Sequence, residues 1–307
     1  MSLDIYKALT TAEGEGTIIP EKLDPVLIEL ADRVTPLRTL LKRIPWNTNS
    51  YQWNVRTALT SAGFYNESDT FSSGNSTYAR RTAPICMIKA EGQVSNLLQK
   101  TTGGYIDALQ AEIEGATESL SQAEERALVM GNYSAAYTDA DGFDGIAAQV
   151  DQFVDLAGSD LGSDNGCDAL DLSIRTIQDN GGKVDLIVVS SRDKQSLNGY
   201  MRDKMIFNWE RVDQALGTVV TYYQGIRVLS TQFIPTNLAY GVTPETNTSF
   251  AMVLDTSQIV VPTVQNVSYE DVPYTGDGMA FRVKLYEAIA VKAKERQVMI
   301  KNVGPIA

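Results

Sequence analysis

Residues 105–131 carry an apolar stripe that constrains the fold more than any other segment of the chain. The apolar residues follow one another at steps of three and four positions, which on an α-helix places them along one narrow face. They are Ile106, Leu109, Ile113, Ala116, Leu120, Ala123, Ala127 and Met130. At about 1.5 Å per residue, the predicted helix is ~40 Å long, close to the width of a small domain. A helix of this length is typical of a structural strut.

The charges of this helix are almost all acidic and fall outside the stripe. They are Asp107, Glu112, Glu114, Glu118, Glu124 and Glu125, against the single base Arg126. We expect these carboxylates to face solvent, because they are scattered around the outer faces of the helix. Pairs of acids can also serve glycoside hydrolysis, so a hydrolase that uses carboxylates is retained as an alternative.

Two segments near the C-terminus offer the apolar partner that the stripe requires. Residues 264–272 and 279–291 have strand character and flank a Gly-rich turn at 273–278. The apolar residues of the second strand are Val283, Leu285, Tyr286, Ile289 and Val291. The stripe could equally be the seam of a coiled coil, but the flanking charges that would pair two helices are missing. We therefore predict that the helix lies across this hairpin.

The composition excludes several classes of site. The 307 residues include no His, which removes Ser-His-Asp and Cys-His nucleophiles and His-ligated zinc. Cys86 and Cys167 match neither a metal pair nor a CxxC motif, and we expect both to be reduced and buried, as in a cytoplasmic protein. The net charge is −12, without a basic stripe, so direct binding of a phosphate backbone is not expected. Neither a secretory signal nor a membrane span is recognisable.

The other motifs that could form a catalytic, nucleotide-binding or metal site are weak. Ser190 follows a strand without a Gly-x-Ser-x-Gly elbow, so we expect it to cap a helix. Residues 14–16 are Gly-Glu-Gly but lack the preceding strand of a dinucleotide site. The acidic loop Asp139–Asp144 could hold a calcium ion, yet the position of the last EF-hand ligand is Val150 instead of Glu. The sequence therefore assigns no catalytic residue, no cofactor site and no metal ligand.

A polar segment at 62–84 separates two stretches with strand character, 46–55 and 85–94. Phe64 and Tyr65 stand among polar neighbours there, which is too little apolar surface for a core. So long a loop is uncommon in a compact domain unless it is functional. Because an isolated hairpin is only marginally stable in water, we expect a partner to order this segment.

The region 149–255 alternates helical and strand patterns. Helices are predicted at 167–180 and at 191–205, the second with a break at Gly199, and a buried strand at 184–190. Further strands are predicted at 219–223, 226–230, 250–254 and 298–303, the last returning to this region. An amphipathic helix at 25–42, kinked at Pro36, is predicted before all of these elements.

The order of features from Ala123 to Ile146 resembles the tailed-bacteriophage major capsid protein family, which has the Hong Kong 97-type fold. A helix end is followed by Gly131-Asn132, a polar loop and Gly-Phe-Asp-Gly-Ile, as after the long spine helix of that family. The run AGFYNESD from Ala62 resembles the Ala-x-Trp-Val-x-Glu pattern of its extended loop, with Phe64-Tyr65 in place of Trp-Val. Residues 18–44 resemble its N-terminal arm.

This resemblance implies an α+β fold with four parts. They are an N-terminal arm at 1–45, an extended β-hairpin loop at 46–98, a peripheral domain with the spine helix and long β-hairpin at 99–148 and 257–291, and an α/β axial domain at 149–256 and 292–307. The expected intersubunit contacts are Glu67, Asp69, Arg80, Arg81 and Asp277.

The function implied is that of a non-enzymatic major capsid protein of a tailed double-stranded DNA bacteriophage. It would form pentamers and hexamers of an icosahedral shell, be assembled in the host cytoplasm, and enclose DNA without sequence-specific binding. A separate scaffolding protein is expected, because few residues precede the arm; a portal and a decoration protein are further expected partners. Some members cross-link a loop Lys to a neighbour, but no Lys lies between Lys42 and Lys89. The alternatives are an encapsulin-type nanocompartment shell protein and a phage-borne carboxylate hydrolase.

Overall fold

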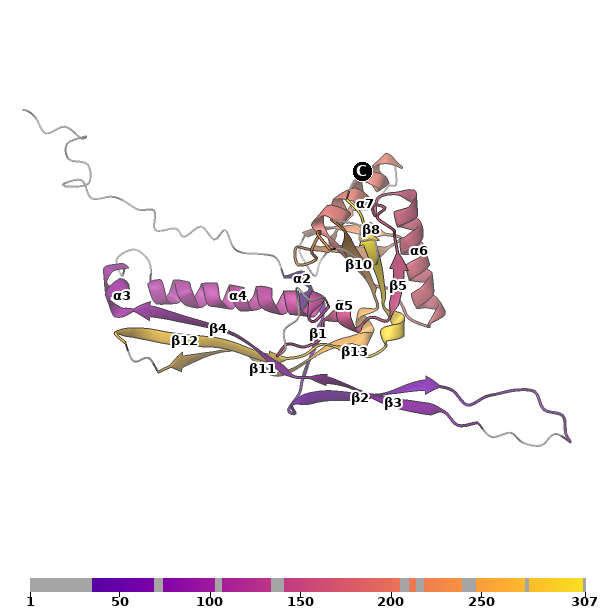
Figure 1. The fold of residues 1–307 in the computed structure, drawn as a ribbon, viewed down its shortest axis with the longest axis horizontal. Coiled ribbons are helices and arrows are strands. Elements are labelled where there is room, and N and C mark those ends of the chain that lie inside the picture. Colours follow the sequence, from indigo (N-terminus) through magenta and orange to yellow (C-terminus); the bar gives the residue numbers. More distant parts are fainter. Residues whose placement is uncertain are drawn as a thin grey trace, which may run out of the picture.

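The computed structural model describes residues 35–68, 74–102, 107–133, 141–204, 210–213, 218–238, 247–273 and 276–305. Figure 1 shows a long layer of strands with one helix along it, an α/β part to one side, and a hairpin that projects away from both. Most of the predicted arm lies outside the described residues. Of the helix expected at 25–42, the structure describes α2, Pro36–Leu40, which begins at the Pro where a kink was predicted.

The long layer is a five-stranded sheet of order β1-β11-β12-β4, with β13 also paired to β11. Its strands are β1 (Lys42–Pro45), β11 (Ile259–Val272), β12 (Gly278–Glu287), β4 (Cys86–Ser95) and β13 (Ala290–Val291). The antiparallel pair β11–β12 is the predicted hairpin. β4 pairs with β12 along its whole length, a neighbour that the local sequence pattern did not identify.

The predicted strut is α4, Ala108–Met130, which we call the spine helix. The Asp107 carboxylate caps its start by accepting hydrogen bonds from the backbone N–H groups of Leu109 and Gln110. In Figure 1 it runs along β12 and β4. Leu120 packs there with Phe281, Val283 and Leu285 of β12. The prediction that the stripe lies on its own hairpin is confirmed. Leu109, Ile113 and Ala116 complete this contact on the helix side.

Three details of the predicted contact differ. Ile289 and Val291 belong to a second core, which also contains the last turn of the spine helix, and Tyr286 is only half-buried because alternation turns it to the other face of the sheet. Phe281, absent from the predicted set, is fully buried over Gly92 of β4. A Cβ at Gly92 would come within 2.5 Å of the Phe281 ring, so only Gly lets the ring lie there.

The expectation that all acids of the spine helix face solvent is wrong for Glu124 and Glu125. Both residues are 0% exposed. The helix end is enclosed by α2 and by the core that joins the sheet to the α/β part, so Leu128, Val129 and Met130 are also buried around its circumference. A one-sided stripe describes only the part of the helix that has a single packing partner.

The projecting hairpin is a separate two-stranded sheet of β2 (Ser50–Ala58) and β3 (Thr77–Pro84). The segment between the strands carries no regular structure where it is described. Within the predicted 46–98 segment, β2 and β3 thus pair with each other, whereas β4 lies in the long sheet. The four domain boundaries themselves stay predictions.

The α/β part contains a seven-stranded sheet of order β5-β14-β10-β6-β9-β8-β7. Its strands are β5 (Gln152–Asp155), β14 (Val298–Val303), β10 (Ser249–Leu254), β6 (Leu186–Ser190), β9 (Ile226–Thr231), β8 (Thr218–Tyr223) and β7 (Glu210–Asp213). The predicted strands at 219–223, 226–230, 250–254 and 298–303 are confirmed within a residue. The return of the last strand is also confirmed, because β14 lies between β5 and β10.

Two long helices accompany this sheet, α6 (Asp164–Asp179) and α7 (Ser191–Asp203). The Ser190 hydroxyl caps α7 by accepting from the backbone N–H of Asp193, as predicted for a Ser without a catalytic partner. The predicted break at Gly199 is wrong, since α7 continues through it. The shorter elements are α3 (Asn96–Thr102), α5 (Ile146–Gln149), η2 (Thr256–Gln258) and η3 (Lys294–Arg296).

Cys86 and Cys167 are reduced, and both are half-buried instead of fully buried as expected. Burial raises the pKa of the Cys167 thiol, which disfavours the reactive thiolate. Among the described helices, none combines the length and the hydropathy required to cross a bilayer.

The contact between the spine helix and the hairpin predicts a large effect of Leu120→Ala. Leu120 is 1% exposed, so removal of its side chain leaves a cavity and should lower the free energy of unfolding by about 2–5 kcal/mol. The control Leu97→Ala, at a side chain that is 71% exposed, should change it by less than about 1 kcal/mol. Urea unfolding of the unassembled chain measures both, and equal effects would contradict the packing described.

Candidate intersubunit surfaces

The β2–β3 hairpin exposes large apolar side chains around its tip. Leu59 is 72% exposed, Phe64 is fully exposed and Tyr65 is 52% exposed. Each leaves apolar surface in water, where burial of a Leu- or Phe-sized side chain is worth about 1.5–3 kcal/mol. A projecting element with this pattern is suited to contact with another molecule.

The root of the hairpin is fixed to the body of the molecule. Tyr51 packs against Trp46 and Trp53, with ring centroids 4.9 and 5.5 Å apart. The Trp53 indole Nε1 donates a hydrogen bond to the Lys292 carbonyl at 3.2 Å. Arg81 donates to the same carbonyl and forms an ion pair with Glu295 at 2.7 Å. The hairpin therefore combines an anchored root with an exposed apolar tip.

The structure places the predicted contact residues at separate locations. Arg80 and Glu67 are exposed on the hairpin; Arg81 points to the body, where it pairs with Glu295 of its own chain. Asp277 lies in the turn between β11 and β12 and accepts a hydrogen bond from the Asn96 side chain at 2.5 Å. Asp69 lies outside the described residues. An intersubunit role for all five stays a prediction.

A second exposed apolar group lies at the outer end of the long sheet. Leu97 and Leu98 of α3 are 71% and 48% exposed, and Met279 at the start of β12 is 52% exposed. Figure 1 places α3 and the start of β12 at the end of the molecule opposite the hairpin. The elongated molecule thus has exposed apolar side chains at both ends.

A buried carboxylate–arginine cluster joins the segment 36–45 to the end of the spine helix. It consists of Arg38 of α2, Arg43 of β1, Glu124 and Glu125 of the spine helix, and Glu287 of β12. Glu124 accepts from Arg38 at 2.7 Å and also pairs with Arg43. Arg43 donates to Glu287 at 2.9 Å. The segment is thereby tied to both the helix and the sheet.

Glu125 has a different role within this cluster. Its two carboxylate oxygens accept hydrogen bonds from the backbone N–H groups of Leu37 at 3.0 Å and Arg38 at 2.8 Å. These N–H groups belong to the first turn of α2, and Thr35, the cap residue, provides no side-chain hydrogen bond. Glu125 thus supplies from another helix the acceptor that a helix start requires.

Burial dominates the electrostatics of the cluster. It raises the pKa of Glu125 to about 7, against the lowering effect of the two backbone hydrogen bonds. It also raises the pKa of Glu287 to about 8, with the Glu124 carboxylate adding to the shift and Arg43 opposing it. These are the raised values expected for carboxyl groups removed from water.

The sequence did not predict this cluster. Two consecutive Glu residues on a helix are ordinarily solvated, and Arg38 and Arg43 lie far from them along the chain. One signal was available: Leu128, Val129 and Met130 widen the apolar stripe to every face at the helix end. That widening indicates that the last turns are enclosed.

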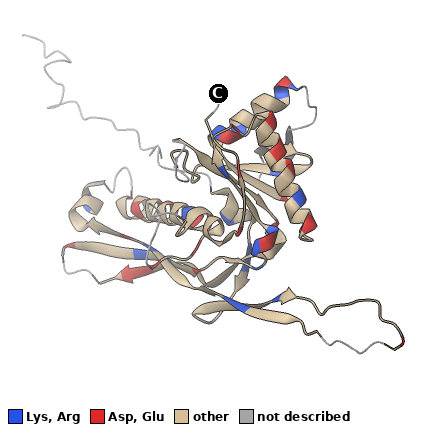
Figure 2. Ribbon diagram, turned by 45° about the vertical axis from the view of Figure 1, so that its right-hand side comes forward, with Lys and Arg blue, Asp and Glu red and all other residues tan. Residues whose placement is uncertain are grey.

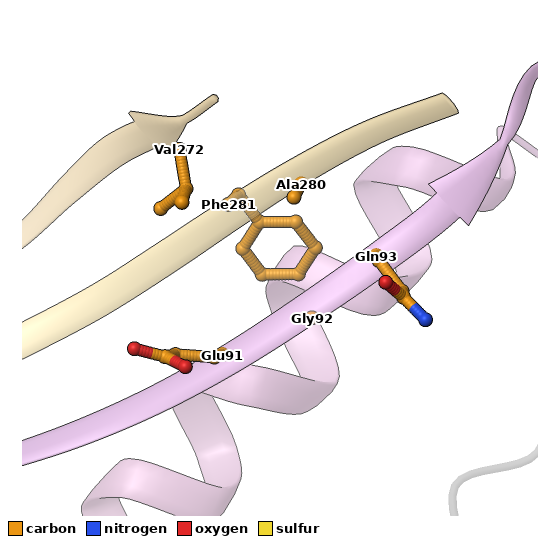
Figure 3. Close-up of a pocket in the computed structure, with 6 residues that line it drawn as sticks. All are labelled: Glu91, Gly92, Gln93, Val272, Ala280 and Phe281. Atoms are coloured by element: carbon orange, nitrogen blue, oxygen red, sulfur yellow. The ribbon is translucent and has the colours of Figure 1, made fainter. Parts of the chain in front are cut away.

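A hollow in the long sheet has no catalytic constellation. It is lined by Glu91, Gly92, Gln93, Val272, Ala280 and Phe281, and Figure 3 shows the Phe281 ring over the strand at Gly92. Glu91 is the one titratable residue of the lining, and hydrogen bonds from Lys89 and Arg282 lower its pKa. A glycosidase requires two carboxyl groups with different environments, so this hollow does not support the hydrolase alternative.

Neither a metal site nor a basic face is evident in the described part of the chain. It contains no group of three His, Cys, Asp or Glu residues placed to hold an ion. Asp144 of the candidate calcium loop accepts a hydrogen bond from Asn132 at 3.1 Å, whereas Asp139 lies outside the described residues. Figure 2 shows acidic and basic residues interspersed along the helices of the α/β part.

The family model of the SU10 major capsid protein matches residues 5–303, nearly the whole chain. The chain belongs to this family. Its function is therefore that of a phage major capsid protein, a component of the capsid that assembles as an oligomer, and the expected family resemblance is confirmed. No curated protein matches it in sequence.

Solved structures show the same Hong Kong 97-type fold. The SrpI encapsulin of Synechococcus elongatus PCC 7942 is 14% identical with a TM-score of 0.70, covering 97% of each chain. A structure from Mycobacterium phage Ogopogo is also 14% identical with a TM-score of 0.70, covering 96% of this chain and 99% of that one. The capsid of Myoviridae phage XM1 is 12% identical with a TM-score of 0.67, covering 94% and 99%. At these identities the likeness concerns the fold alone.

The carboxylate–arginine cluster predicts that Arg43→Met destabilises the capsid protein. Glu124 and Glu287 would lose their shared partner inside the protein, at a cost near the lower end of about 3–5 kcal/mol because Arg43 is 30% exposed. The control Arg282→Met removes a more exposed pair with Glu91 and should cost less than about 1 kcal/mol. Urea unfolding compares the two, and a loss no greater for Arg43→Met than for the control would show that the cluster does not hold the segment.

Proposed function

We propose that this capsid protein forms pentamers and hexamers that close an icosahedral shell around double-stranded DNA, with the hairpin tip of each copy seated on a neighbour. The observation that carries the proposal is the contrast within the hairpin. Its root is fixed by Trp53 and Arg81, whereas Leu59, Phe64 and Tyr65 near its tip are exposed. A rigid base directs the tip outward, and a neighbouring copy would remove the apolar side chains from water.

The capsid protein would assemble in the host bacterial cytoplasm with a separate scaffolding protein and a portal, and a decoration protein would bind the finished shell. Its role would be structural and not enzymatic. In support, the buried carboxylates Glu124 and Glu287 are paired with arginines instead of facing a cleft. A net charge of −12 would let the wall enclose DNA without binding it tightly.

An encapsulin-type shell is the second candidate. The likeness to the SrpI encapsulin, with a TM-score of 0.70, is the observation that favours it. The family model is that of a phage major capsid protein, which supports the phage shell more strongly. The contents of shells purified from the native source distinguish the two, since a phage shell holds DNA and a nanocompartment holds a protein cargo.

Size-exclusion chromatography and negative-stain microscopy of the purified chain test the proposed function. A shell protein should elute as capsomers or form closed particles, with coexpressed scaffolding protein where required. A monomer of 33.6 kDa under all these conditions would contradict the proposal and would favour the hydrolase alternative.

The apolar tip predicts an assembly defect in the double variant Phe64→Ser, Tyr65→Ser. Both side chains are exposed in the single chain, so folding should be unchanged while the yield of shells falls at least tenfold. The matched control Phe64→Leu, Tyr65→Phe keeps the tip apolar and should assemble. Circular dichroism monitors folding and negative-stain microscopy counts particles. Normal shells from the Ser variant would contradict the seating of the tip on a neighbour.

The absence of Lys between Lys42 and Lys89 predicts shells without covalent links through the hairpin. Because no amine is available there for an isopeptide bond to a neighbour, mature particles boiled in detergent should give a single monomer band. A ladder of higher bands on the denaturing gel would refute this prediction.

A further inference from the structure

The carboxylate–arginine cluster holds an unequal number of charges, and its carboxylates, unlike its arginines, are closed off from water. Glu124, Glu125 and Glu287 are each 0% exposed, and among the residues that the structure describes, Arg38 and Arg43 are the two guanidinium groups that pair with them. Three ionised carboxylates and two guanidinium groups leave one uncompensated negative charge. An unpaired buried charge is costly, and uptake of one proton removes it.

The geometry indicates which carboxylate takes the proton. Both oxygens of Glu124 are paired with Arg38 and Arg43, and both oxygens of Glu125 accept backbone hydrogen bonds. Glu287 pairs with Arg43 through Oε2, whereas its buried Oε1 has no hydrogen-bond partner in the described part of the chain. An unpaired carboxylate oxygen is the site where protonation breaks no existing contact.

The charged groups that act on Glu287 and Glu125 come from three elements. Glu124 of the spine helix, Arg43 of β1 and Arg38 of α2 act on Glu287 of β12. Glu124 and Arg38 also act on Glu125. The arginines favour the ionised forms, but burial and Glu124 outweigh them and raise the pKa of both acids.

We propose that the carboxylate–arginine cluster is a proton-dependent latch, which holds residues 36–45 on the end of the spine helix when it binds one proton and releases them when it loses it. The segment is placed to transmit this change. α2 rests on Glu125 through its first-turn N–H groups, and β1 continues through Trp46 into the hairpin root. Loss of the proton would thus loosen both the start of α2 and the support of the hairpin.

The direction of the pH effect follows from the raised pKa values. Glu287 binds the proton more tightly when the segment is attached than when it is detached. In the detached state the Glu carboxyl has its ordinary pKa of 4.5. The contribution of the cluster to attachment is therefore complete below pH 4.5 and falls as the pH rises through about 8, the pKa of Glu287 in the attached state. Acids in surface ion pairs have lowered pKa values, so their contribution to stability has the opposite pH dependence and is lost as the pH falls.

Hydrogen–deuterium exchange of the full chain in its unassembled state tests the latch. Protection factors for residues 36–45, corrected for the intrinsic effect of pH, should fall at least about tenfold between pH 6 and pH 9. Residues 108–120 of the spine helix lie outside the cluster and should keep their protection. Since no shell is involved, failure of this test would leave the proposed assembly function untouched.

The variant Glu287→Gln separates the latch from general alkaline loosening. Gln resembles the protonated Glu and cannot ionise, so the fall in protection of residues 36–45 should become at least severalfold smaller than in the wild type. The matched control is Glu270→Gln, at an exposed acid of the β11–β12 hairpin that pairs with Lys284. This variant should behave like the wild type. Constant protection in the wild type, or an equal fall in Glu287→Gln, would overturn the proposal. The wild-type result decides the question even if the variant does not fold.

Discussion

The packing of the spine helix on the long hairpin is the contact on which the other features depend. Leu120 lies against Phe281, Val283 and Leu285, and Gly92 lets the Phe281 ring of β12 lie over β4. A helix of 23 residues cannot bend easily, and fixed to two long strands it makes one stiff element. The projecting hairpin and the α/β part can act at a distance because this element holds them in place (Figure 1).

The packed, stiff body of the capsid protein and its exposed apolar side chains lie in different parts of the molecule. The core that contains Leu128, Phe250 and Ile289 joins the spine helix to the α/β sheet, so the two parts form a continuous body. The three most exposed large apolar side chains, Phe64, Leu59 and Leu97, lie at the ends, on the hairpin tip and on α3. Rigid bodies with apolar ends suit repeated contacts, since weak contacts that recur in a closed assembly reinforce one another. The carboxylate–arginine cluster lies where the hairpin support meets the spine helix, which is why its charge state matters for the whole arrangement.

The sequence predicted the features that depend on local periodicity. The spacing around Leu120 and the alternation around Val283 identified both partners of the central contact, and the residues after Ala123 indicated the family. Burial of Glu124 and Glu125 could not be predicted in this way, because it depends on Arg38 and Arg43, about 80 residues away along the chain. The pairing of β4 with β12 is likewise a long-range choice, for which the alternating pattern of β4 allows several neighbours. The ion pair of Arg81 with Glu295 also joins residues far apart in the sequence, and no local pattern distinguishes Arg81 from Arg80.

Cryo-electron microscopy of the assembled particle tests most directly whether a rigid body with an anchored hairpin is the building unit of the shell. Leu59, Phe64 and Tyr65 of each copy should lie against a neighbouring copy, while Trp53 and Arg81 keep their contacts with Lys292 of their own chain. A shell in which the hairpin tips point into solvent, or in which the hairpin root has left its own body, would contradict this description.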